Sequence, residues 1–285
     1  MLIGVLAALA AATFYAVGVA LQSLDARHSH EEDVLRPGLL LGLVRRPRWL
    51  LGGVISFLGW PLQAFALSQA PLAVVQPALA FNLVVLLVIA RKFTPDPVTR
   101  SDIIGALAIT AGVIALTFAA PAQGGDHGTR TLVLVAILGV LSALPLILRE
   151  HMLRVAILLP VAAGIAFTLL AIATRLADDT LSGDRLLACA CWLGVAAFAG
   201  YAATVCEMSA MRTRSATLVV PVVVSVESVL PIIVGPLALS EQLPTSTVAR
   251  LAIALGLIAI VVGVSLLGRA PALAELRHEP NVAAA

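Results

Sequence analysis

Residues 215–239 read SATLVVPVVVSVESVLPIIVGPLAL and hold one charged side chain, Glu227, near the middle. As an α-helix the stretch would extend about 37 Å, enough to cross a hydrocarbon layer of about 30 Å. Glu227 would then lie near the bilayer midplane, where a carboxylate is costly unless it meets water, a partner or a proton. The stretch predicts a transmembrane helix with a functional acid. The alternative is a protonated Glu227 that is hydrogen-bonded to Ser225, Ser228 or a neighbouring helix.

Prolines interrupt the same stretch at Pro221, Pro231 and Pro236. Each removes a backbone donor and disturbs the helical hydrogen bonds. In lipid the freed carbonyls need substitute partners, so a kinked helix of this kind is expected to line protein or a cavity. We take Pro221 and Pro231, together with Pro77, as predicted helix-break positions.

The composition is that of a polytopic membrane protein. Of the 285 residues, 60% are hydrophobic and 12% are charged, whereas a soluble domain has about 25% charged residues. The net charge of +2 does not indicate nucleic acid, because the basic residues sit in short loops. The sequence has no zinc signature, no G-x-S-x-G and no Walker A motif. We therefore expect a protein that is not an enzyme and that has no cofactor, no metal centre and no means of ATP-driven transport.

We predict an all-α fold with nine transmembrane helices. The predicted spans cover residues 2–23, 49–69, 72–90, 102–120, 131–148, 155–174, 186–211, 215–239 and 248–267. If the N-terminus is outside, the cytoplasmic loops and tail hold 14 Lys and Arg residues and the outer loops hold 4. This asymmetry predicts a multi-pass protein of the cytoplasmic membrane with a cytoplasmic C-terminus. If the short apolar segment Pro37–Val44 dips into the membrane, there are ten spans and the N-terminus moves inside.

The two halves of the chain resemble each other. Residues 105–112 (GALAITAG) match residues 256–263 (GLIAIVVG), with glycines seven apart on one helix face. Two further matches occur in the same order upstream, namely Gly59-Trp60 with Gly200-Tyr201 and Pro77 with Pro221. Matching spans lie five apart and so cross in opposite directions, which predicts two inverted repeats. We assign residues 1–120 to the first repeat, 131–268 to the second and 269–285 to a cytoplasmic tail.

These features are similar to the drug/metabolite transporter superfamily, in particular its EamA-like type of two five-helix repeats. The turn at residues 239–243 (LSEQL), followed by the helix with Gly256 and Gly263, looks like the end of a repeat in that family. Residues 46–77 resemble the NIPA-type magnesium transporter branch. That branch usually has an acidic residue in the second span, where this chain reads Gly59-Trp60-Pro61 with Gln63 nearby. The resemblance implies a secondary transporter or, through the magnesium branch, a divalent cation transporter.

The candidate substrate or coupling-ion residues are the polar and aromatic side chains inside the spans. They are Glu227, Gln63, Asn82, Gln76, Trp60 and Tyr201. The amides would line a polar cavity or form interhelical hydrogen bonds, and the two aromatic residues would form cavity walls or pack in the core. For Glu207 we expect snorkelling or pairing with Arg212 or Arg214.

We expect a secondary transporter of a small metabolite or drug-like solute, coupled to an ion or proton. The alternatives are a magnesium or divalent cation transporter and a membrane assembly protein that transports nothing. The expected partners are the lipid bilayer and the small-molecule or ion substrate, with a homodimer left open and no nucleic acid.

Overall fold

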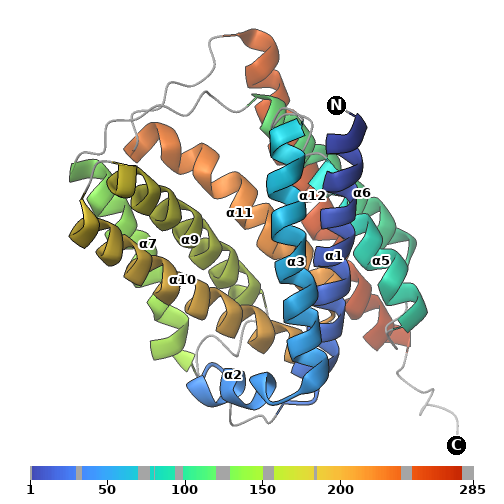
Figure 1. Cartoon of the computed structure of the whole chain (residues 1–285). Coiled ribbons are helices and arrows are strands. Elements are labelled where there is room, and N and C mark those ends of the chain that lie inside the picture. The colour runs from blue at the N-terminus through green and yellow to red at the C-terminus, as the bar shows by residue number, and fades with distance from the viewer. Residues whose placement is uncertain are drawn as a thin grey trace, which may run out of the picture.

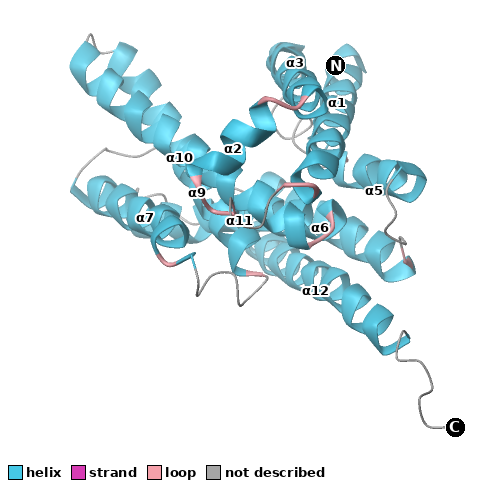
Figure 2. Ribbon diagram, turned by 90° about the horizontal axis from the view of Figure 1, so that it is seen from below, coloured by secondary structure: helices cyan, strands magenta, loops and turns pink. Residues whose placement is uncertain are grey.

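The fold of the protein was taken from a computed structural model, which describes residues 2–29, 34–69, 78–79, 81–93, 99–119, 129–149, 157–182, 185–238 and 246–277. All regular structure in this part of the chain is helical (Figures 1 and 2). The helices are α1 (Leu2–Arg27), α2 (Pro37–Val44), α3 (Pro47–Gln69), α5 (Asn82–Phe93), α6 (Arg100–Ala119), α7 (Thr129–Ile147), α9 (Leu158–Ser182), α10 (Leu186–Thr213), α11 (Ala216–Ala238) and α12 (Thr247–Arg277). The expected all-α class is confirmed.

Each predicted apolar segment overlaps one of these helices, but several helices extend beyond the apolar residues. α9 continues to Ser182, and α12 continues to Arg277 through most of the segment that we expected as a tail. Helix ends follow capping and propensity, whereas the predicted span ends follow hydropathy. At the start of α6, Thr99 and Asp102 form a capping box, in which the Thr99 amide donates to Asp102 Oδ2 at 2.7 Å and the Asp102 amide donates to Thr99 Oγ1 at 3.3 Å.

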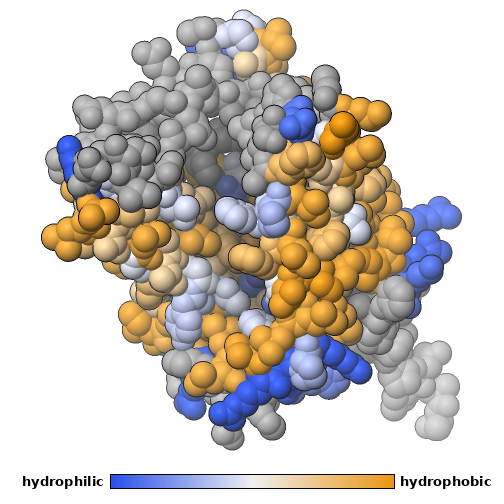
Figure 3. Space-filling view, viewed as in Figure 1, coloured by the Kyte–Doolittle hydropathy of each residue, from blue (hydrophilic) through white to orange (hydrophobic). Residues whose placement is uncertain are grey.

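In α1, small residues fill the helix interface and large aliphatic residues face outward. In α1 the buried positions are Gly, Ala and one Ser, whereas Leu2, Ile3 and Leu6 are exposed. Figure 3 shows the hydrophobic surface over the side of the molecule on which α1 and α3 lie. In water such a surface would be unfavourable, but in a bilayer lipid covers it and small residues allow close helix packing.

Within the described residues, three helical segments are long and apolar enough to cross a membrane. They are Leu2–Arg27, Leu186–Arg212 and Thr247–Leu267. Shorter apolar segments are Thr131–Ile147, Leu158–Thr174 and Ala216–Leu230. The architecture therefore fits a helical membrane protein.

α6 and α12 cross in an antiparallel, reciprocal contact of their glycines. A Cβ atom built on Gly105 would lie 2.8 Å from the carbonyl oxygen of Gly263, and one built on Gly263 would lie 2.6 Å from that of Gly105. Gly112 and Gly256 make the same exchange, at 2.7 and 2.9 Å. The two seven-residue glycine pairs identified in the sequence are thus each other's partners. Their backbones approach so closely that a side chain at any of the four positions would push the helices apart.

The other extensive helix pairs are α1–α3 and α9–α10. In Figure 1, α3 and α1 stand on one side, and α7, α9, α10 and α11 slant away on the other. Figure 3 shows this face hollowed between the α3 side and the α9–α10 side, with hydrophilic residues visible inside; we call this feature the central hollow. α2 lies below the hollow, at the end of the molecule opposite the N-terminus, and contacts both α3 and α10 (Figures 1 and 2).

Candidate functional site

α11 is the helix around which the candidate site is built, because it contacts α1, α5, α6, α7, α9, α10 and α12. Its valine-rich sequence is not a strong helix former in water, but in lipid an α-helix satisfies the backbone within one segment. The helix continues through Pro221, which is buried, and the Ser225 hydroxyl donates to the Pro221 carbonyl at 2.6 Å. The hydroxyl of Ser225 is therefore engaged within its own helix, and its proton does not go to Glu227.

Glu227 lies at the middle of α11, and its side chain is exposed. It follows the start of the helix by 11 residues, or about 16 Å. An exposed carboxylate on a helix surrounded by other helices is the arrangement expected of an acid that faces an internal opening. Among the described residues no cation forms an ion pair with Glu227.

Glu207 of α10 is the second acid of the interior. Its side chain is 9% exposed, and the neighbouring residues from Val205 to Met211 are all buried. Our interpretation that Glu207 snorkels or pairs with Arg212 or Arg214 is wrong for this structure: no ion pair joins Glu207 to either arginine among the described residues, and Arg212 Nε donates to the carbonyl of Ser29 at 3.2 Å. Instead, Glu207 is buried in α10, which contacts α11, the helix that carries Glu227. The physical reason is that α10 is enclosed on all faces at this point, so its side chain cannot reach the surface.

Tyr15 and Gln63 form a polar contact between α1 and α3. The Tyr15 hydroxyl donates to Gln63 Oε1 at 2.8 Å. The ring of Tyr15 covers Gly59, where a Cβ atom would lie 2.8 Å from the ring. Gln63 was predicted as a site residue and takes the interhelical hydrogen bond that we had considered as its alternative role. Tyr15 was missed, although a lone polar side chain in the middle of an apolar span is the signal that would have found it.

Tyr15 and Glu227 lie at a similar height in the molecule. Tyr15 precedes the end of α1 by 12 residues, and Glu227 follows the start of α11 by 11 residues. The end of α1 lies near α2, since Arg46 bonds to it, and the start of α11 follows the end of α10, where Leu35 bonds to Ser209. The two side chains are therefore about 16–18 Å from these helix ends along their own helices.

Asn82 begins α5 and is half-buried, and its Oδ1 atom is buried without a hydrogen-bond partner. A buried amide oxygen without a donor is costly, and such groups in native structures usually serve a ligand or water. Asn82 is thus an acceptor near the start of α5 that the described residues leave unsatisfied.

The remaining predicted residues are placed as follows. Trp60 is 64% exposed, and Tyr201 is half-buried against the main hydrophobic core. Pro231 lies inside α11, whereas Gln76 and Pro77 fall outside the described residues.

An open apolar pocket of about 210 Å³ lies between α11 and α12, lined by Ser225, Val226, Val229, Leu230 and Ile260. It does not include Glu227.

The part of the chain that the structure describes contains no group of three or more His, Cys, Asp or Glu side chains placed to hold a metal ion. The two acids of α10 and α11, Glu207 and Glu227, are fewer than such a group requires, and each can bind a proton or a cationic group through its carboxyl.

No protein-family model matches the chain. The chain is similar to a protein of Corynebacterium glutamicum that is described as uncharacterized, with 32% identity over 127 residues. This match covers 44% of the present chain and 44% of the relative, so the chain aligns with less than half of the length of the curated relative. No solved structure matches. The class that the fold and the apolar surface define is a helical membrane protein.

Proposed function

We propose that this protein is a secondary transporter that moves a small metabolite or drug-like solute across the cytoplasmic membrane, coupled to a proton or another ion. The observation that carries the proposal is the buried acid Glu207 of α10, which contacts α11, the helix that carries Glu227, and no cation forms an ion pair with either acid among the described residues. Intramembrane acids are expensive and usually mark an ion or substrate pathway.

The proposal includes an inverted repeat within nine spans, and the contacts between the helices support this part of it. The reciprocal contact of Gly105 with Gly263 and of Gly112 with Gly256 is what a two-fold axis between α6 and α12 would produce. The tight pairs α1–α3 and α9–α10 then correspond, as do α5 and α11. In this scheme α7 connects the two halves. Many secondary transporters have inverted repeats and a substrate site near the midplane between them.

The proposed topology places the N-terminus outside and both α2 and the C-terminus in the cytoplasm, in accord with the charge asymmetry. Single cysteines in a background without native cysteines test it: Arg48→Cys next to α2 and Leu187→Cys at the other end of α10, both at exposed positions. An impermeant thiol reagent added to intact cells should label Leu187→Cys and not Arg48→Cys. Labelling of Arg48→Cys from outside would refute this orientation.

The functional test uses Glu227→Gln, which keeps the size and hydrogen-bonding capacity of the side chain but cannot ionise. After a thermal-shift screen has identified a solute, purified protein is reconstituted into liposomes and gradient-driven uptake is measured. We expect Glu227→Gln to fold normally and to lose concentrative uptake, and Ser228→Ala, its half-buried neighbour, to retain it. Full gradient-driven uptake by Glu227→Gln would end the proposal.

A divalent cation transporter is the second candidate, since carboxylate oxygens such as those of Glu207 and Glu227 are the kind of ligand that magnesium prefers. Uptake of a fluorescent-indicator cation into the same liposomes, abolished by Glu207→Gln and Glu227→Gln together, would favour it. Absence of flux for every solute and cation, with Glu227→Gln stable, would favour the assembly protein instead.

A further inference from the structure

Residues 34–46, here called the α2 arm, form a cap on one end of the bundle. Its inward side chains Val34, Leu35, Leu39 and Leu43 are 1–3% exposed and belong to the main hydrophobic core. Its outward face includes Leu41, which is 66% exposed. The arm rests on α3 and α10 below the central hollow (Figure 2). It is too short to cross a membrane, at about 12 Å, so its place in the fold is that of a cover.

The arm covers the part of α10 that carries the interior acid Glu207. The amide of Leu35 donates to Ser209 Oγ at 3.1 Å, and this serine lies two residues after Glu207. Just beyond the arm, in the first turn of α3, Trp49 Nε1 donates to the sulfur of Met208 at 3.4 Å. Removal of the arm would therefore open the end of α10 next to Glu207.

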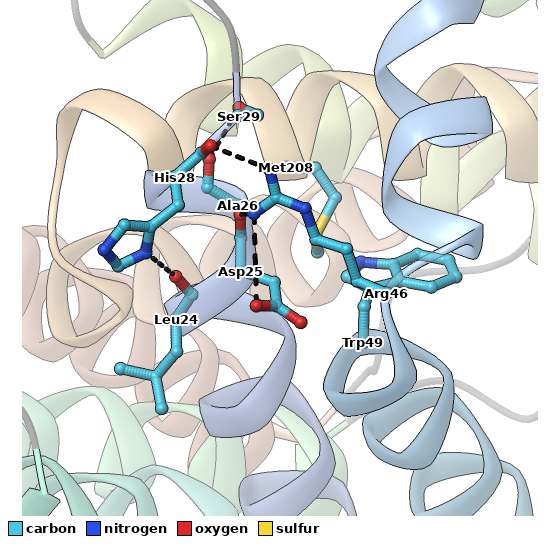
Figure 4. Close-up of polar contacts among 8 residues, drawn as sticks. All are labelled: Leu24, Asp25, Ala26, His28, Ser29, Arg46, Trp49 and Met208. Atoms are coloured by element: carbon cyan, nitrogen blue, oxygen red, sulfur yellow. Dashed lines mark hydrogen bonds and ion pairs between the residues drawn. The ribbon is translucent and has the colours of Figure 1, made fainter.

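One arginine ties the arm to α1 (Figure 4). Arg46 Nη1 donates to the carbonyl of Asp25 and Nη2 donates to the carbonyl of His28, both at 2.8 Å. These are carbonyls at the end of α1, which an arginine satisfies well and whose dipole favours a positive charge. The ion pair with Asp25 Oδ1 is long at 4.0 Å, and Asp25 Oδ2 is buried without a partner. Arg46 therefore binds the backbone carbonyls of α1 closely, whereas its ion pair with the Asp25 carboxylate is weak.

The arm begins with a strained residue. Leu35 has φ 57 and is the only residue other than glycine with a positive φ in the part of the chain that the structure describes. This left-handed conformation is unfavourable for a bulky L-residue and persists only where its surroundings enforce it. Such strain favours movement of the arm away from the bundle once the hydrogen bonds of Arg46 and Leu35 are broken.

We propose that the α2 arm is a gate over the end of α10 next to Glu207, closed in this structure and latched by Arg46. This inference rests on the proposed transport function, for which an opening at one end must alternate with an opening at the other. Release of Arg46 from the end of α1 frees one end of the arm, and the strain at Leu35 turns it away from Ser209. A solute or ion then reaches Glu207 from the α2 side.

The test compares Arg46→Gln with Arg48→Gln in the full chain, reconstituted in lipid nanodiscs. Arg48 is exposed and forms no hydrogen bond or ion pair with the described residues, which makes it the matched control. The first readout is hydrogen exchange of peptides that cover residues 34–46. The second is the rate of N-ethylmaleimide labelling of the native, fully buried Cys206, with Cys189 and Cys191 replaced by alanine.

We expect Arg46→Gln to raise both rates about tenfold, which is the effect on an opening equilibrium of a loss equivalent to one charge-assisted hydrogen bond. Arg48→Gln should change them less than about twofold. Peptides of α6 and α12 should exchange as in the unchanged protein. Equal rates in the two variants would overturn the gate, as would faster labelling of Cys206 without faster exchange in the arm.

If Arg46→Gln speeds exchange throughout the chain, the variant has unfolded, and the exchange of Ser209→Ala is measured instead. This variant removes the hydrogen bond from the Leu35 amide and leaves Arg46 in place. A faster exchange confined to the arm supports the gate, and no change refutes it. Neither readout needs a transported solute. If the arm opens in Arg46→Gln but Glu227→Gln keeps full gradient-driven uptake, the transport proposal is rejected and the movement of the arm is retained. If Glu227→Gln loses uptake but the arm does not open, only the gate is rejected.

Discussion

Replacing Gly263 with alanine tests the closest helix contact in the molecule. The added Cβ would lie 2.6 Å from the carbonyl oxygen of Gly105 and equally close to a side-chain carbon of Ile109. Real Cβ atoms essentially never approach another heavy atom within 3.0 Å. The Ile109 side chain can rotate, but the oxygen belongs to the backbone of α6 and cannot. The helices must therefore separate by several tenths of an ångström, and this separation loosens the reciprocal contact at Gly112 and Gly256 as well.

Overpacking of this kind typically destabilises by about 1–3 kcal/mol. In water the gain in helix propensity from glycine to alanine, about 1 kcal/mol, would offset part of this loss. In a membrane the separated helices remain helical, so the offset is smaller. We therefore expect Gly263→Ala to lose about 1–3 kcal/mol of stability.

The assay is thermal unfolding in detergent, with Gly139→Ala and Gly194→Ala as controls, because a Cβ at either position would meet nothing within 4 Å. Gly263→Ala should melt several degrees below the unchanged protein, and the controls should melt at or slightly above it. The double variant of Gly105 and Gly263 should lose less than the sum of the single losses, since one separation relieves both clashes. A melting temperature for Gly263→Ala equal to that of Gly139→Ala would refute the reasoning.

Three further changes test local contacts by the same assay. Thr99→Ala should cost about 1 kcal/mol, because it removes the hydroxyl side of the capping box with Asp102; an unchanged stability would contradict the box. Tyr15→Phe and Gln63→Leu should show a coupling of about 0.6 kcal/mol in a double-mutant cycle, and additive losses would mean that the hydrogen bond contributes nothing. Gly59→Ala should cost less than Gly263→Ala, since the clashing atoms belong to a side chain that can move; an equal or larger loss would show that the Tyr15 ring is held rigidly.

Local features of the site could be predicted from the sequence, but not the partners of each side chain. Gln63 and Glu227 stand out because a polar residue in an apolar span is costly wherever the span packs. The expected pairing of Glu207 with Arg212 failed because closeness along a helix does not decide orientation. Arg212 turns to the carbonyl of Ser29, 183 positions away in the chain, and α10 leaves Glu207 enclosed.

The sequence by itself determined that this chain is helical and which segments are apolar, because a backbone in lipid must satisfy its own hydrogen bonds. It also marked the glycines seven apart on one face of residues 105–112 and 256–263. Only the tertiary structure decided that these two faces meet each other, that Glu207 is buried, and that Arg46 caps the end of α1. Spacing along one helix specifies the shape of a face, whereas the choice of its partner depends on how all the faces fit together at once.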